Sequence, residues 1–220
     1  WMDNKLEQWY RRANTRLRQV NPDAAMCTWT INAGRFGHFL TSPRGMSQRM
    51  HLLFGLPVQE WWLDESNQGG SVIPAFGAAY IRAATGNRVG ACEPYYMSRG
   101  NPYGDDSLPA HETLTRAMLV ITNGALCAEY IGQGKRAATD MEAVRQRSKW
   151  LTRIEQMPWA AMLVSEQTRQ FYGLTQVYDR FLPHPLGFFR AAMEEHLALN
   201  LITDWESVRP ERLSKYKVLI

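Results

Sequence analysis

The chain has 220 residues, 45% of them hydrophobic and 21% charged, which is typical of a folded globular protein with one large domain or two small ones. The formal net charge is +4, but the Lys and Arg residues are scattered, and no nucleic-acid-binding motif accompanies them. No apolar run reaches the ~18 residues that a membrane-spanning helix needs. We therefore expect neither a nucleic acid nor a membrane among the partners of this protein.

The first part of the chain alternates apolar strands with helices. Apolar residues at helical spacing predict a helix over 3–20, which Asn21-Pro22-Asp23 ends. Strands are then expected at 24–30, 57–62, 89–92 and 125–130, and helices at 43–54, 72–85, 110–122 and 137–155. Continuous apolar strands that alternate with helices predict a parallel sheet with helices on both faces. Four such units amount to half of a (β/α)8 barrel, also called a TIM barrel.

The pattern changes near Met157-Pro158. Strands are expected at 159–165, 201–204 and 217–220, helices at 166–172 and 179–199, and a linker at 205–215. This order predicts the start of a second, doubly wound α/β domain. We place the first domain at 1–156 and the second at 157–220. Ser165 is expected to be a helix N-cap, because it follows a strand and lacks the Gly-x-Ser-x-Gly surroundings of a hydrolase nucleophile.

Glu93 is the first candidate for chemistry, because it follows the short apolar run Val89-Gly90-Ala91-Cys92. A carboxylate at the end of a barrel strand lies where such enzymes place their catalytic groups. An ionised carboxylate is also costly at this position unless it is paired or exposed in a cleft. Glu93 is therefore a candidate nucleophile, or a stabiliser of an oxocarbenium-like transition state. The plain alternative is a loop glutamate or a structural ion pair.

Acidic and aromatic residues also gather at the ends of other strands, as sugar-binding sites require. The candidate substrate contacts are Trp61, Trp62, Asp64, Glu65, Tyr95, Tyr96 and Tyr130. Carboxylates accept hydrogen bonds from hydroxyl groups, and aromatic rings stack on the apolar faces of sugars. Strand alternation leaves open which of Glu60, Asp64 and Glu65 would face a ligand. The alternative is a helix N-cap followed by solvated acids.

Metal and cofactor chemistry has little support in the sequence. The residues Cys27, Cys92 and Cys127 have no zinc-ligand spacing, and their apolar surroundings predict small buried side chains. The five histidines are dispersed and form no metal-binding motif. We therefore expect no metal and no organic cofactor.

The order of these parts resembles glycoside hydrolase family 42 β-galactosidases. The points of resemblance are Asn21-Pro22-Asp23 before a strand, Glu93 at a strand end, Asn123-Gly124-Ala125 entering the next strand, and the stretch from Ala161 to Tyr172. On this basis, the run from Trp1 to Gly134 is similar to the C-terminal half of the family's barrel, strands five to eight. The run from about Pro158 to Ile220 is similar to the start of its trimerisation domain, which has a glutamine-amidotransferase-like fold.

The resemblance implies a retaining glycosidase that acts on β-galactosides or similar β-linked sugars. It makes Glu93 the nucleophile at the end of the seventh strand and implies assembly into trimers. The acid/base glutamate, at the end of the fourth strand, would precede Trp1, so we expect the chain to be a segment of a longer protein that is inactive alone. The loop Pro94-Tyr95-Tyr96 and the ending of the sixth strand depart from the family pattern, and both departures concern the identity of the sugar.

Two other functions are compatible with the same elements. One is a non-catalytic carbohydrate-binding or scaffold relative that keeps the barrel and the assembly domain. The other is an amidotransferase-type enzyme in the second domain, but that chemistry needs a nucleophilic cysteine, and no Cys follows Cys127.

Overall fold

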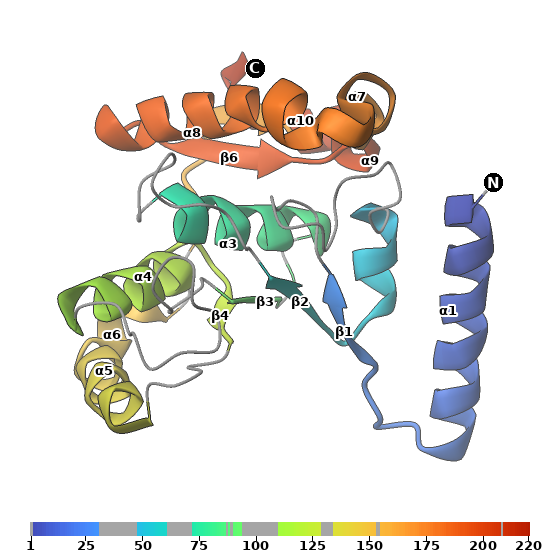
Figure 1. The fold of residues 1–220 in the computed structure, drawn as a ribbon, viewed down its shortest axis with the longest axis horizontal. Helices are drawn as coiled ribbons and strands as arrows, with labels where there is room; N and C mark the ends of the chain where they lie inside the picture. The colour runs from blue at the N-terminus through green and yellow to red at the C-terminus, as the bar shows by residue number, and fades with distance from the viewer. Residues whose placement is uncertain are drawn as a thin grey trace.

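A computed structural model shows a mixed α/β protein, mostly helical, with two small parallel sheets (Figure 1). The structure describes residues 2–30, 48–60, 72–86, 88, 90–93, 110–128, 134–152, 155–207 and 209–220. Within these ranges, no helix is both long enough and apolar enough to cross a membrane.

The strands form two separate parallel sheets. The first sheet contains β1 (Cys27–Thr30), β2 (Leu56–Glu60), β3 (Ala91–Glu93) and β4 (Leu126–Cys127), in the order β1-β2-β3-β4. The second contains β5 (Ala160–Leu163), β6 (Leu199–Ile202) and β7 (Val218–Leu219), in the order β6-β5-β7. Each pair of neighbouring strands is parallel. The seven strands of the described ranges each lie within or overlap a strand range that the sequence predicts.

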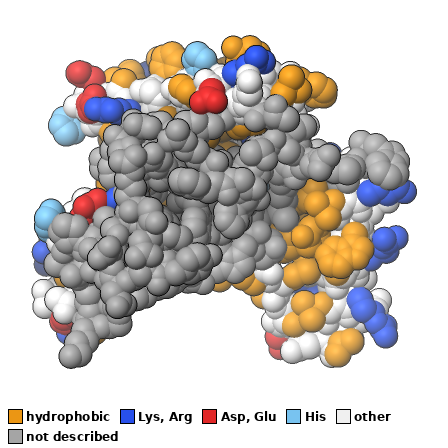
Figure 2. Space-filling view, viewed as in Figure 1, with side chains coloured by type: hydrophobic (Ala, Val, Ile, Leu, Met, Phe, Trp, Pro, Cys, Tyr) orange, Lys and Arg blue, Asp and Glu red, His pale blue; other side chains and the backbone are white. Residues whose placement is uncertain are grey.

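Helices connect the strands. They are α1 (Met2–Val20), the 3₁₀ helix η1 (Gln48–Leu53), α3 (Val72–Ala84), α4 (Ala110–Thr122), α5 (Gly134–Gln146), α6 (Ser148–Leu151), α7 (Glu166–Thr168), α8 (Pro183–Glu194), α9 (Asp204–Ser207) and α10 (Pro210–Leu213). Between α7 and α8 lie the π-helical turn η2 (Arg169–Gly173), the 3₁₀ turn η3 (Leu174–Gln176) and the π-helical turn η4 (Val177–Phe181). The first helix is amphipathic as predicted: Figure 2 shows hydrophobic side chains along its inner side and Lys and Arg along its outer side.

Helix α3 lies between the first sheet and the layer formed by β6 and α8 (Figure 1). Twelve of its 13 residues are buried, because neighbouring elements cover it on every side. Its sequence suits this place, since alanines and Gly77 let the layers approach closely while Phe76 fills the space between them. The Phe76 ring meets that of Phe189 on α8 edge to face, with 5.4 Å between ring centroids. Both sheets therefore share one hydrophobic core, which contains residues from both sides of the predicted domain boundary.

Three sequence predictions in the second part were wrong in detail. The helix expected over 179–199 ends at Glu194, and His196 has a left-handed φ of 54°, which turns the chain into β6. The region expected to be a linker, 205–215, contains most of α9 and all of α10. The helix expected over 166–172 is α-helical only to Thr168 and continues as a π-helical turn.

We predict opposite effects for two glycine-to-alanine substitutions. Gly90 leads into β3, and a Cβ there would lie 2.7 Å from Ile81 Cγ1, so Gly90→Ala should lower the free energy of unfolding by about 1–3 kcal/mol. Gly187 lies inside α8 with nothing within 4 Å of its ideal Cβ, so Gly187→Ala should raise it by roughly 0.5–1 kcal/mol. Urea unfolding measures both values, and equal effects would contradict the packing around Gly90.

Candidate functional site

Glu93 is the last residue of β3, at the carboxyl end of the strand. Its Cα is paired in register with that of Glu60, the last residue of the neighbouring parallel strand β2. Ala91 and Cys92 are buried, and the Cys92 carbonyl accepts the Ala128 N–H at 3.0 Å, so the end of β3 is held on its other side as well. The structure describes the backbone of both glutamates but not their side chains. The sheet thus brings two acidic positions together at one edge.

The other predicted substrate contacts lie outside the described residues. They are Trp61, Trp62, Asp64, Glu65, Tyr95, Tyr96 and Tyr130. Each follows β2, β3 or β4 in the chain, beyond the carboxyl end of its strand. Their role in binding a sugar stays a prediction.

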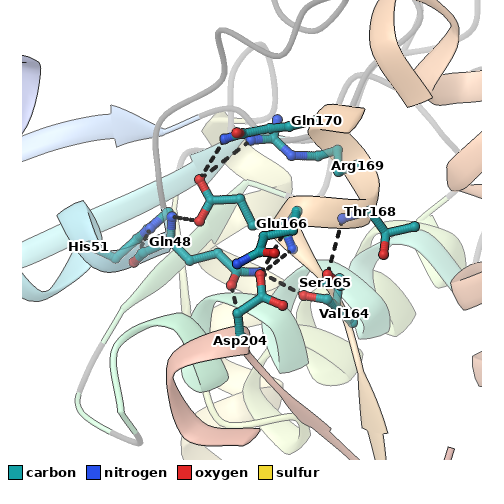
Figure 3. Close-up of polar contacts among 10 residues, drawn as sticks. Gln48, His51, Val164, Ser165, Glu166, Thr168, Arg169, Gln170 and Asp204 are labelled. Atoms are coloured by element: carbon teal, nitrogen blue, oxygen red, sulfur yellow. Dashed lines mark hydrogen bonds and ion pairs between the residues drawn. The ribbon is translucent and has the colours of Figure 1, made fainter. Parts of the chain in front are cut away.

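A second polar cluster, which the sequence analysis missed, lies at the carboxyl edge of the second sheet (Figure 3). Asp204 follows β6, and its Oδ2 accepts the backbone N–H groups of Glu166 at 2.6 Å and Gln167 at 3.2 Å. Asp204 therefore satisfies two backbone donors at the start of α7. The predicted N-cap is confirmed, because the Thr168 N–H donates to Ser165 Oγ at 3.1 Å.

Gln48 joins this cluster to the first part of the chain, and only 2% of it is exposed. Its side-chain Nε2 donates to the Val164 carbonyl at 2.7 Å, and its backbone N–H donates to Glu166 Oε2 at 3.0 Å. Its Oε1 accepts the Asp204 N–H at 3.4 Å. One side chain from η1 thus bonds the ends of both β5 and β6, which fixes η1 against the second sheet (Figure 3).

Glu166 faces a cavity of about 380 Å³ lined by residues from η1, α7, η2 and α9, among them Gln48, Gln170 and Asp204. Its Oε1 accepts Gln170 Nε2 at 3.0 Å and lies 4.0 Å from an Arg169 guanidinium nitrogen. Both oxygens of this carboxylate therefore already have partners within the protein. The arrangement is that of a polar joint between η1 and the second sheet rather than of a free acid and base. The signal for it was present in the sequence, since both Glu166 and Asp204 come shortly after buried strands.

The cysteines follow the sequence expectation only in part. Cys92 is buried and Cys127 is half-buried, but Cys27 is exposed, so the prediction of a buried side chain was wrong there. Cys27 begins β1, which has a neighbouring strand on one side only among the residues that the structure describes. Among the described residues, no group of three or more His, Cys, Asp or Glu side chains could hold a metal ion.

Comparison with known proteins leaves the family open. No protein-family model matches the chain, and no curated protein matches it either.

We predict that Tyr80 makes the protein less stable in alkali. Burial raises the pKa of Tyr80 well above its ordinary value, an effect larger than the opposing one of the nearby Arg169 charge. The unfolded chain ionises this group near pH 10, so its contribution to stability is complete below about pH 10 and is lost as the pH rises further. Tyr80→Phe should make the alkaline fall in free energy of unfolding shallower by up to about 1.4 kcal/mol per pH unit. Equal slopes in the two proteins would contradict this.

Removing the Asp204 carboxylate should weaken the joint between η1 and the second sheet. Asp204→Ala leaves two backbone N–H groups without their acceptor, so we expect a loss of about 1–3 kcal/mol in the free energy of unfolding. The matched control is Glu194→Ala, which removes a surface ion pair with Arg190 and should change the value by less than about 1 kcal/mol. Chemical denaturation of both variants gives the comparison, and similar losses would argue against a structural role of Asp204.

Proposed function

We propose that residues 1–156 are the C-terminal half of the (β/α)8 barrel of a retaining glycoside hydrolase, and that Glu93 is its nucleophile. The observation that carries the proposal is the strand order of the first sheet, β1-β2-β3-β4, with every neighbouring pair parallel. Consecutive strands of a barrel take this order, whereas a doubly wound sheet reverses direction at a switch point. Among the four described strands of this sheet there is no reversal. Glu93 then lies at the catalytic edge of such a barrel.

The proposed reaction proceeds in two displacements. The Glu93 carboxylate attacks the anomeric carbon of a β-galactoside or a similar β-linked sugar, while an acid protonates the departing oxygen. Water then attacks the anomeric carbon of the glycosyl-enzyme and releases Glu93. The residue that acted as the acid in the first step, now a base, accepts a proton from this water. The anomeric configuration is retained, because two inversions cancel. Neither of these two steps requires a metal or an organic cofactor.

The second carboxylate of a retaining pair lies about 5–5.5 Å from the nucleophile. The resemblance to family 42 enzymes assigns it to a strand before Trp1. The register offers a second acidic position in this chain, because Glu60 ends a strand roughly 4.8 Å from that of Glu93. The proposal keeps the upstream acid/base and treats Glu60 as a residue whose charge acts on Glu93.

The resemblance also carries a proposal for assembly, in which residues 157–220 mediate formation of a trimer. Large apolar side chains lie exposed in this region, including those of Phe171, Leu197 and Leu219. Interfaces between subunits bury side chains of this kind. Their exposure supports the proposal of an interface in this region.

Covalent trapping of the full-length protein tests the catalytic proposal. Incubation with 2-deoxy-2-fluoro-β-galactosyl fluoride should add one sugar to the peptide that contains Glu93, because the fluorine slows hydrolysis of the ester and fluoride leaves without acid assistance. Glu93→Gln should abolish labelling. Glu60→Gln is the matched control, since it removes an acid at the paired register position and should still be labelled on Glu93. Peptide mass spectrometry locates the sugar.

Three outcomes separate the alternatives. A label on a carboxylate other than Glu93 would overturn the assignment of the nucleophile. A folded protein that is labelled by no fluorosugar, but binds sugars in calorimetry, would support the non-catalytic relative. Loss of labelling in Glu60→Gln together with normal labelling in Glu93→Gln would transfer the role of nucleophile to Glu60.

A further inference from the structure

The second sheet contains a topological switch point. The chain passes from the central strand β5 to β6 on one side and then returns to β7 on the other side. In open parallel sheets, ligands bind in the crevice outside the carboxyl ends of the strands at such a point. Here the crevice is expected between the ends of β5 and β7, on the opposite side of β5 from the Gln48 cluster.

A hollow of about 240 Å³ lies at this place, and we call it the switch pocket. Leu163 and Ser165 from the end of β5, Ile220 after β7, and Pro185 and Phe188 from α8 are among its lining residues. Ligand pockets for drug-sized molecules measure about 300–1,000 Å³, so the occupant of this one is smaller, of the order of one ring with a short substituent.

The lining of the switch pocket is apolar with a positive rim. Met162 and Phe181 form part of its buried wall, with 3% and 7% exposure. Arg180 and His184 both line it, and none of the described residues around it is acidic. The acids of this sheet edge, Glu166 and Asp204, line the other cavity instead. The charge distribution therefore favours a ligand with one apolar part and one anionic group.

The wall that carries Tyr172 and Arg180 has an unusual backbone. Two π-helical turns, η2 and η4, are separated by the 3₁₀ turn η3, whose first residue, Leu174, has φ 47° and ψ −125°. A non-glycine residue in this region is strained by roughly 1–3 kcal/mol, and such strain gathers at ligand sites. π-Helical turns are also frequent at functional sites. In addition, Tyr172 and Phe188 are each 54% exposed within this lining, which leaves apolar area for a ligand to cover.

The anionic group is better matched by a carboxylate than by a phosphate. Phosphate sites at switch points use glycine-rich loops whose N–H groups point at the phosphate. The corresponding segment after β5, residues 164–166, contains no glycine, and the N–H groups of Glu166 and Thr168 already have acceptors within the protein.

We propose that the switch pocket binds a small aromatic carboxylic acid, with its ring against Phe181, Pro185 and Phe188 and its carboxylate at Arg180 and His184. This inference does not depend on Glu93 or on the glycosidase proposal. It assigns a second, separate binding site to the other sheet of the protein.

Ligand titration tests the proposal. The probe is 4-fluorophenylacetate, a fluorinated phenylacetate, and its binding is followed by ¹⁹F NMR. We expect saturable binding, no comparable binding of the uncharged 4-fluorophenylacetamide, and no competition by inorganic phosphate at equal concentration. Arg180→Gln should weaken binding at least about tenfold, because it removes a charge-assisted contact. The matched control is Arg190→Gln, an exposed arginine elsewhere on the α8 layer that is paired with Glu194, and it should leave affinity unchanged.

A second variant distinguishes a loss of binding from a loss of folding. Phe188 is half-exposed, so Phe188→Ala should keep the thermal unfolding midpoint of the wild type while weakening binding several-fold. The proposal is overturned if the folded wild type shows no saturable binding, or if the amide or phosphate binds as well as the carboxylate. It is also overturned if Arg180→Gln and Arg190→Gln bind equally well.

Discussion

The complete burial of helix α3 is the constraint on which the rest of the structure depends. A helix with apolar residues on every side is stable only when other elements cover all of it. The first sheet covers one side, and β6 with α8 covers the other, so neither part can be removed without exposing apolar surface. Its alanines, such as Ala78 and Ala79, allow close approach, and Phe76 extends from it to Phe189. The two regions that differ in sequence pattern are therefore joined through a single core.

Both sheets place their polar chemistry at the carboxyl ends of their strands. In the first sheet, Glu60 and Glu93 end neighbouring strands at paired positions. In the second, β5 separates two environments: acids bonded to backbone N–H groups on the β6 side, and a positively charged, apolar hollow on the β7 side. This separation follows from topology, because loops after parallel strands all emerge at one edge. The acids on the β6 side bond to Gln48 and to backbone N–H groups and so have a structural role, whereas the hollow on the β7 side is open to a ligand.

Sequence reasoning predicted the elements better than their contacts. Apolar runs and turn residues were sufficient to place all seven strands and α1, α3 and α4, and the strand-end position of Glu93 follows directly from its place after Cys92. The π-helical turns on either side of Leu174 were not predicted, because a π-helical turn has no sequence pattern that separates it from an α-helix. The bonds of Gln48 with Val164 and Asp204 were not predictable either, since local pattern carries no information on partners more than 100 residues away.

The distance in sequence between these partners has a consequence for synthesis on the ribosome. Gln48 and Val164 are separated by 116 residues, and translation adds roughly 5–20 residues per second. The first sheet and α3 are therefore made of the order of ten seconds before the strands that cover them. During that interval the apolar outer face of α3 has no native partner, and non-local closure of so long a loop is intrinsically slow. That apolar face of α3 therefore stays uncovered until β6 and α8 have been synthesised.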